Sequence, residues 1–218
     1  MDSLRFFMPG PIRVKICGIC SEADARGAID AGADALGFNF WPGSKRALDF
    51  HASRGWMESL PPDVARVAVV VNASAEVLRE LQRSGIFHAI QFHGDETPAF
   101  CQEHGGERWI RAVRVVGDGS LGEAISYGTP WLLADAAAPA GAYGGTGERA
   151  DAGLVASLVA GHPERHVILA GGLRPDNVVS AIRSVRPFGV DVASGVEDAP
   201  RRKNVEAMQH FVREAQGT

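Results

Sequence analysis

The chain has 218 residues, of which 45% are hydrophobic and 22% charged, and its formal net charge is −4. This composition is typical of a soluble globular protein, and the charge gives no electrostatic basis for binding nucleic acid or an anionic membrane. Three cysteines are too few for a disulfide scaffold, and no apolar run approaches the roughly 20 residues that cross a bilayer, so we expect a cytoplasmic protein.

Apolar, β-branched segments alternate with helical patterns along the chain. The predicted strands are residues 12–17, 34–40, 64–71, 87–92, 108–115, 130–135, 165–171 and 188–193. The predicted helices are residues 21–31, 51–59, 74–83, 97–104, 119–126, 151–161, 175–184 and 203–215. Ser21 and Ser74 are typical helix N-caps, and Pro98 and Pro175 lie where a first helical turn tolerates proline. Residues 1–11 are expected to form a loosely ordered N-terminal extension.

Most predicted strands are nearly continuous apolar runs, as in residues 64–71 (VARVAVVV), which is typical of parallel strands buried on both faces. Eight strand–helix units without a break in composition predict a single-domain (βα)8 TIM barrel over residues 12–218. A doubly wound open sheet is the alternative, but it usually has fewer strands.

Two chemically active side chains end strands of the predicted barrel, where the active sites of such barrels lie. Cys17 ends the first strand and Asp135 the sixth, so both would project into the same mouth. A thiol, with a reference pKa of about 8.5, can act as a base, and an aspartate with a raised pKa can act as an acid. Such a pair suits proton transfer on a small phosphorylated sugar. The alternatives are that Cys17 fills the core and that Asp135 caps a loop.

Glycines at the ends of the last three strands predict a phosphate site, because their backbone N–H groups can approach an anion closely. The candidate residues are Gly145, Thr146 and Gly147 after strand six, Gly171 and Gly172 after strand seven, and Ser194 and Gly195 after strand eight. The chain has neither a Gly-x-Gly-x-x-Gly after strand one nor a Walker motif, so a nucleotide is not expected.

Other features admit competing interpretations. Cys17 and Cys20 form a Cys-x-x-Cys, which in a thioredoxin-like domain would be a redox pair, but such a domain would leave half of this chain unexplained. A zinc site would need further ligands, for which Cys101 and His104 are only a rough candidate. The basic residues 201–203 are expected to be a solvated helix start.

Seven segments together resemble the phosphoribosylanthranilate isomerases of tryptophan biosynthesis. They read KICGI at 15–19, AGADALGF at 31–38, QFHGD at 91–95, LLAD at 132–135, YGGTG at 143–147, LAGGL at 169–173 and GVDVASGVE at 189–197. The resemblance implies a cofactor-free and metal-free Amadori rearrangement of N-(5-phosphoribosyl)anthranilate, with Asp135 as general acid and Cys17 as general base. It implies Arg46 as the group that holds the anthranilate carboxylate.

The resemblance also makes Gln91, His93 and Asp191 candidate substrate-binding residues. The alternative for His93, which ends a strand, is a structural histidine that bonds to the backbone. The expected partner is a small phosphosugar, with no nucleic acid or membrane, and the chain is expected to be a monomer or a homodimer. Two other barrels compete with this interpretation. A pentulose-phosphate epimerase would use paired aspartates and a metal rather than a cysteine with an aspartate. A barrel that only binds a phosphorylated ligand would not require both Cys17 and Asp135.

Overall fold

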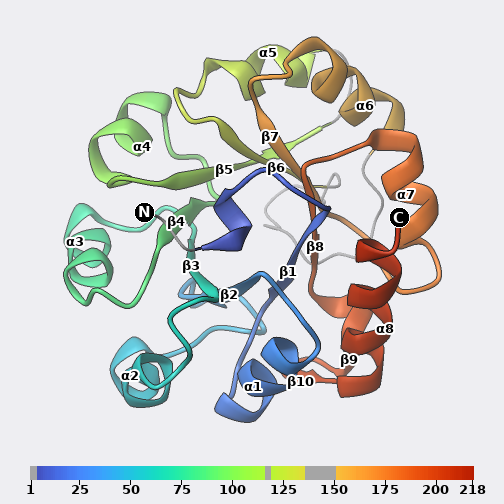
Figure 1. Ribbon diagram of the computed structural model, residues 1–218. Helices are drawn as coiled ribbons and strands as arrows, with labels where there is room; N and C mark the ends of the chain where they lie inside the picture. Colours follow the sequence, from blue (N-terminus) through green and yellow to red (C-terminus); the bar gives the residue numbers. More distant parts are fainter. Residues whose placement is uncertain (1–3, 116–118, 136–150) are drawn as a thin grey trace.

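A closed barrel of eight parallel strands forms the centre of the protein, and the eight α-helices of the described residues surround it (Figure 1). The computed structural model describes residues 4–115, 119–135 and 151–218. The strands pair in chain order, β1 to β8, and β8 closes the barrel against β1. The predicted TIM-barrel fold is therefore confirmed, and the doubly wound sheet is wrong.

Each predicted strand and helix is present. The strands are β1 (Arg13–Cys17), β2 (Ala35–Asn39), β3 (Ala65–Val70), β4 (Ala89–Phe92), β5 (Trp109–Arg114), β6 (Trp131–Asp135), β7 (His166–Leu169) and β8 (Gly189–Val192). The helices are α1 (Glu22–Asp30), α2 (Phe50–Glu58), α3 (Ala75–Arg83), α4 (Pro98–His104), α5 (Gly119–Ser126), α6 (Ala152–Gly161), α7 (Val178–Val185) and α8 (Val205–Gln216). Smaller elements are the 3-10 helices η1 (Arg5–Phe7) and η2 (Ser194–Val196) and an antiparallel pair, β9 (Glu197–Ala199) and β10 (Arg202–Lys203).

The helix starts follow the expected cap chemistry except at α7. Ser21 accepts a hydrogen bond from the backbone of α1 and Ser74 from that of α3, while Pro98 begins α4. Pro175, expected in the first turn of α7, lies before it. The side chain of Asn177 holds this segment in a turn, since its Oδ1 accepts from the Arg174 backbone N–H (2.8 Å) and its Nδ2 donates to the Gly172 carbonyl (2.9 Å).

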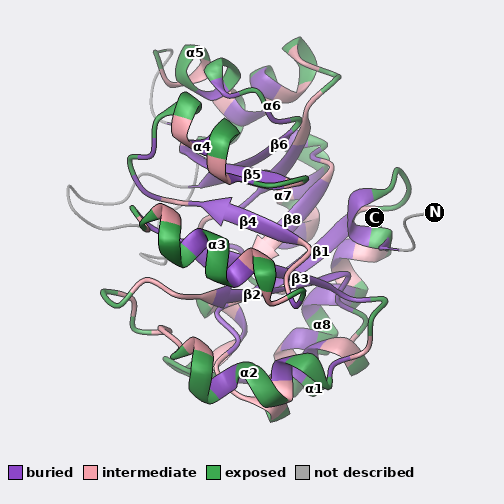
Figure 2. Cartoon of the chain, turned by 90° about the vertical axis from the view of Figure 1, so that its left-hand side faces the viewer, coloured by how far each residue is buried: buried purple, intermediate pink, exposed green. Residues whose placement is uncertain are grey.

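The strand residues alternate between two buried layers, shown in purple in Figure 2. Val14 and Ile16 of β1 belong to the outer layer, which packs against the helices. The residues between them point into the barrel, because successive side chains of a strand face opposite sides. Lys15 and Cys17 therefore lie inside, in the same interior that small apolar side chains such as Ala35 and Val67 fill.

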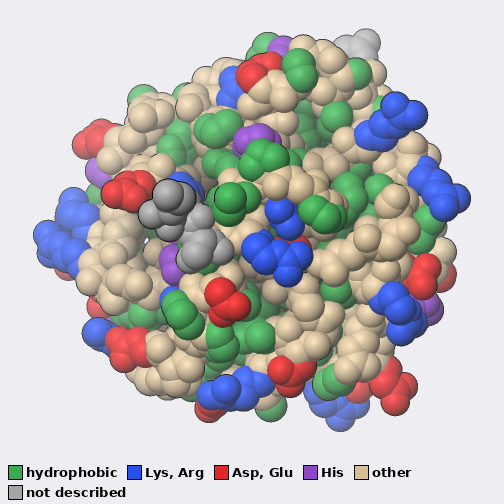
Figure 3. Space-filling view, in the orientation of Figure 1, with side chains coloured by type: hydrophobic (Ala, Val, Ile, Leu, Met, Phe, Trp, Pro, Cys, Tyr) green, Lys and Arg blue, Asp and Glu red, His purple; other side chains and the backbone are tan. Residues whose placement is uncertain are grey.

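The N-terminal segment covers one end of the barrel (Figure 1). Phe6 is fully buried, and the ring of Phe7 packs edge-on against Trp131 of β6 with centroids 5.1 Å apart. The Arg13 guanidinium donates to the carbonyls of Met8 and Pro9. Lys and Arg side chains lie near the middle of this face among hydrophobic ones (Figure 3). Two buried phenylalanines thus pack this segment against the barrel, and the loose order expected for residues 1–11 stays a prediction.

None of the helices in the described part of the chain is long and apolar enough to cross a membrane.

Candidate active site

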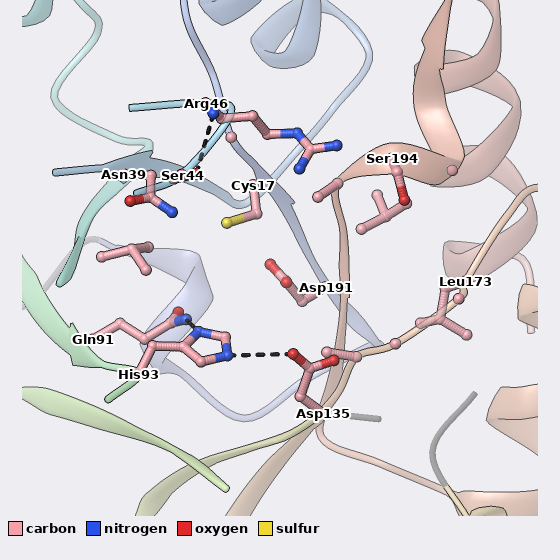
Figure 4. A pocket seen from close by; sticks show the side chains of 18 of the residues that line it. Cys17, Asn39, Ser44, Arg46, Gln91, His93, Asp135, Leu173, Asp191 and Ser194 are labelled. Carbon is pink, nitrogen blue, oxygen red and sulfur yellow. Dashed lines mark hydrogen bonds and ion pairs between the residues drawn. The ribbon is translucent and has the colours of Figure 1, made fainter. Parts of the chain in front are cut away.

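A cleft of about 800 Å³, which includes space open to solvent at its mouth, lies at the carboxyl ends of the strands (Figure 4). Ten predicted site residues line it: Cys17, Arg46, Gln91, His93, Asp135, Gly171, Gly172, Asp191, Ser194 and Gly195. The remaining three, Gly145, Thr146 and Gly147, lie outside the described residues. The fold thus brings side chains from β1, β4, β6 and β8 together in one cleft.

Cys17 lies at the last position of β1, half-buried in the wall of the cleft. Its carbonyl oxygen accepts a hydrogen bond from Nζ of Lys203 at 2.6 Å. Burial raises the pKa of the Cys17 thiol above its ordinary value, while the positive charges of Lys15 and Lys203 act in the opposite direction. The thiol therefore occupies a site where its ionisation depends on neighbouring cations.

Asp135 ends β6 and belongs to a chain of polar side chains. Its Oδ2 lies 3.2 Å from Nε2 of His93, and Nδ1 of the same imidazole lies 3.1 Å from Nε2 of Gln91. Gln91 is 1% exposed, and its buried Oε1 has no hydrogen-bond partner among the residues that the structure describes. Figure 4 shows these three side chains in a row along one side of the cleft. Gln91 thus contacts His93, and His93 contacts the predicted acid.

Asp191 of β8 accepts a hydrogen bond from Nζ of Lys15 at 2.7 Å. The two residues face each other in the parallel register of β1 and β8. In the view of Figure 4, Asp191 lies between Cys17 and Asp135. This carboxylate therefore reaches the cleft already paired with a buried cation.

Arg46 lies in the segment after β2 and forms a two-point ion pair with Glu197. Its Nε donates to Oε1 at 2.7 Å and its Nη2 to Oε2 at 2.6 Å. Lys203 donates to the same carboxylate at 2.9 Å and to the carbonyl of Ala193. The Lys203 side chain is fully buried, so the prediction of a solvated helix start is wrong at this residue. It is buried because three acceptors around the end of the barrel satisfy its ammonium.

The glycine-bearing ends of β7 and β8 lie beside each other at the cleft. Gly171 and Gly172 have positive φ angles (86° and 62°), a conformation that favours glycine. A side chain at Gly195 would overlap the carbonyl oxygen of Leu173, so this position also requires glycine. These close backbones are the part of the predicted phosphate site that the structure describes.

Sequence reasoning missed several residues at the site. Asn39 and Ser44 line the cleft, and the strand-end position of Asn39 was an available signal. Glu197 and Lys203 lie against the cleft residues without a local pattern that marks them, and Lys15 has only its charge within an apolar strand as a signal. Their partners come from segments that are far away in the sequence, so only the closed barrel brings them together.

Comparison with known proteins identifies the family. The family model described as N-(5'phosphoribosyl)anthranilate (PRA) isomerase matches residues 14–214. An N-(5'-phosphoribosyl)anthranilate isomerase from Myxococcus xanthus is 46% identical over 209 residues, which are 94% of this chain and 96% of that protein. The chain belongs to the N-(5'-phosphoribosyl)anthranilate isomerase family.

Solved isomerase structures have the same fold. The phosphoribosyl anthranilate isomerase from Thermotoga maritima has a TM-score of 0.84 at 38% identity, over 95% of this chain and all of that one. Another, at 36% identity with a TM-score of 0.81 and the same coverage, was crystallised with reduced 1-(o-carboxyphenylamino)-1-deoxyribulose 5-phosphate.

Membership of this isomerase family decides between the competing interpretations. The protein is an enzyme, not a binding module, and it is not a pentulose-phosphate epimerase. The closed barrel excludes a thioredoxin-like domain, and both Cys17 and Cys20 are free thiols. Cys101 is buried in the core, and burial raises its pKa to about 12, which disfavours the thiolate that a zinc site needs.

Proposed function

We propose that this isomerase rearranges N-(5-phosphoribosyl)anthranilate with Asp135 as general acid and Cys17 as general base. The observation that carries the proposal is the cleft itself, into which these two side chains project from β6 and β1. A thiol and a carboxyl group on different sides of one cleft can reach two different atoms of a single sugar.

The reaction balances with one proton given and one taken. The Asp135 carboxyl group protonates the ribose ring oxygen, the bond from this oxygen to C1 breaks, and the anthranilate nitrogen supplies the electrons that form an iminium. The Cys17 thiolate then removes the proton from C2, which gives an enolamine. Tautomerisation places a proton on C1 and leaves a ketone at C2, so the product is 1-(2-carboxyphenylamino)-1-deoxyribulose 5-phosphate. These steps require no cofactor or metal.

Gln91 and His93 would support the acid. If the Gln91 amide is turned so that its Oε1 faces His93, this buried oxygen gains the hydrogen bond that it lacks. His93 then carries its proton on Nδ1, and its Nε2 accepts the proton of the Asp135 carboxyl group. Gln91 would therefore act through His93, and the predicted contact of either residue with substrate stays a prediction.

The two anionic ends of the substrate would bind to different groups of the cleft. Arg46 has five N–H donors, of which Glu197 takes two, so others can bind the anthranilate carboxylate. The backbone N–H groups around Gly171, Gly172 and Gly195 would bind the phosphate, together with Ser194. Gly145, Thr146 and Gly147 are proposed for the same role from the sequence alone.

The test is the consumption of freshly made phosphoribosylanthranilate by purified protein, followed as loss of anthranilate fluorescence. Cys17→Ser and Asp135→Asn should each lower kcat by about 10²–10⁴-fold, the usual contribution of a general acid or base. The matched control is Cys101→Ser, which changes a buried thiol away from the cleft. Full activity in both site variants would refute these roles.

The oligomeric state, monomer or homodimer, stays a prediction. A solved relative from Thermotoga maritima is described as a dimeric isomerase from which monomers were generated. Light scattering on the purified protein would decide between the two states.

A further inference from the structure

A fully buried lysine lies directly below the proposed base. Lys15 precedes Cys17 by two residues in β1, so both side chains point into the barrel. The side chain of Lys15 has no exposed surface. Burying an ammonium among small apolar residues costs several kcal/mol unless partners compensate it. A lysine at this position therefore needs an explanation in terms of what it contacts.

The Lys15 ammonium lies close to two groups, the Asp191 carboxylate and the Cys17 sulfur. One N–H donates to Oδ1 of Asp191 at 2.7 Å. Gly37, which faces Cys17 across β1 and β2, provides room for the second contact. A Cβ at Gly37 would lie 3.0 Å from Nζ of Lys15 and 2.7 Å from Sγ of Cys17, so these two atoms converge on the same small space. An ammonium has three N–H donors, and Asp191 uses only one.

The charges around the thiol come from several elements. Asp191 belongs to β8, Lys203 to β10, and Arg46 to the segment after β2, while the His93–Asp135 pair lies across the cleft. Burial raises the pKa of Cys17, and among the charged neighbours Lys15 opposes this effect most strongly. The charges of Asp191 and Cys17 in turn raise the pKa of Lys15 despite its burial, so Lys15 stays protonated.

We propose that Lys15 is a positioning residue that favours the thiolate form of Cys17 against the effect of burial and thereby prepares the base of the reaction. Its ammonium sits between the thiolate and Asp191, stabilises both anions, and touches no reacting atom of the substrate. The inference rests on the proposed role of Cys17 as base. A purely structural lysine, present only to neutralise Asp191, would leave the ionisation of Cys17 unchanged when removed.

The test measures the thiolate directly, without isomerase activity. In a Cys20→Ser background, which removes the second half-buried thiol, the rate of iodoacetamide alkylation of Cys17 is followed against pH. Lys15→Met should move the midpoint of this curve to higher pH and slow alkylation near neutral pH about tenfold, because the thiolate is the reactive form. Asp191→Asn should move the midpoint in the opposite direction, since its charge disfavours the thiolate.

A double variant covers the case in which Lys15→Met fails to fold with Asp191 left unpaired. Lys15→Met/Asp191→Leu removes both buried charges, which proteins often tolerate better than the loss of one. Its alkylation midpoint should still lie above that of the wild type. In Lys15→Met, where it folds, kcat should fall while KM changes little, and kcat should recover as pH rises. An unchanged alkylation curve would overturn the role of Lys15, whereas a wild-type enzyme without activity would overturn the role of Cys17 alone.

Discussion

Replacing Glu197 should show how much the buried ion pairs beside the cleft contribute to the stability of the protein and to substrate binding. Its side chain is 4% exposed and accepts hydrogen bonds from Arg46 at 2.6 and 2.7 Å and from Lys203 at 2.9 Å. Glu197→Gln keeps the size of the side chain but leaves two cations without their carboxylate. Removing one partner of a buried ion pair costs about 3–5 kcal/mol, so the variant should lose a large fraction of a typical stability of about 5–15 kcal/mol.

Urea unfolding measures this loss as a lower midpoint with an unchanged slope. Glu58→Gln is the control, because its exposed pair with Arg54 lies on α2 and is worth only about 0.3–0.5 kcal/mol. Arg46 also loses the groups that orient its guanidinium. The KM for phosphoribosylanthranilate should therefore rise in the Glu197 variant and stay unchanged in the control.

The stability difference between the wild type and Glu197→Gln should also depend on pH, in a direction that follows from the pKa of Glu197. Burial alone would raise the pKa of Glu197, but the hydrogen bond with Arg46 and the charge of Lys203 outweigh it and lower the pKa. A carboxyl group with a lowered pKa in the folded state stabilises the protein above its unfolded value of about 4.3 and loses this effect as the pH falls through the folded value. The difference between wild type and Glu197→Gln should thus shrink in acid. A loss below about 1 kcal/mol near neutral pH, or one that does not depend on pH, would refute the reasoning.

Two further predictions test the two ends of the barrel. Phe6→Ala should lower the free energy of unfolding, measured in urea, by about 3–5 kcal/mol, because its ring is fully buried. At temperatures where the protein is folded, kcat should not change, because this ring lies at the end of the barrel opposite the cleft. A loss of less than about 1 kcal/mol would show that the segment contributes no packing. Gly195→Ala should raise the KM at least about tenfold, some 1.4 kcal/mol, because the new methyl group overlaps the Leu173 carbonyl and separates the ends of β7 and β8. The control is Gly55→Ala in α2, where a methyl group meets nothing within 4 Å and should stabilise the protein. Equal KM values in the two variants would contradict the phosphate site.

Hydrophobic periodicity predicted the strands and helices because each signal is local. The run at 64–71 reads as a strand buried on both faces, and β3 is buried along its whole length. The positions of Cys17 and Asp135 in the cleft followed from the same reasoning, since strand ends in a barrel share one mouth. The segment η1 was not predicted, because three residues are too short for a periodic pattern and their burial depends on Trp131, far along the chain.

The ion pairs of the cleft were missed for a related reason. Nothing near Lys15 in the sequence indicates that Asp191, which is 176 positions away, will accept its hydrogen bond. The same holds for Arg46 and Glu197, which are 151 positions apart. A charged residue inside an apolar strand is the one available signal, because an unpaired ammonium is not tolerated there. Lys15 could have been marked on this ground, but its partner could not.

The charges around the thiol also suit a reaction that moves protons without changing the charge of the site. Five charged side chains lie near Cys17, and together they carry one positive charge: Lys15, Arg46, Lys203, Asp191 and Glu197. In the proposed reaction, the Cys17 thiolate offsets this charge at the start, while Asp135 is neutral. At the end Cys17 is neutral and the Asp135 carboxylate offsets it. Because one negative charge disappears at Cys17 as another forms at Asp135, the net charge of the cleft does not change, and Lys15 keeps Asp191 as its partner throughout.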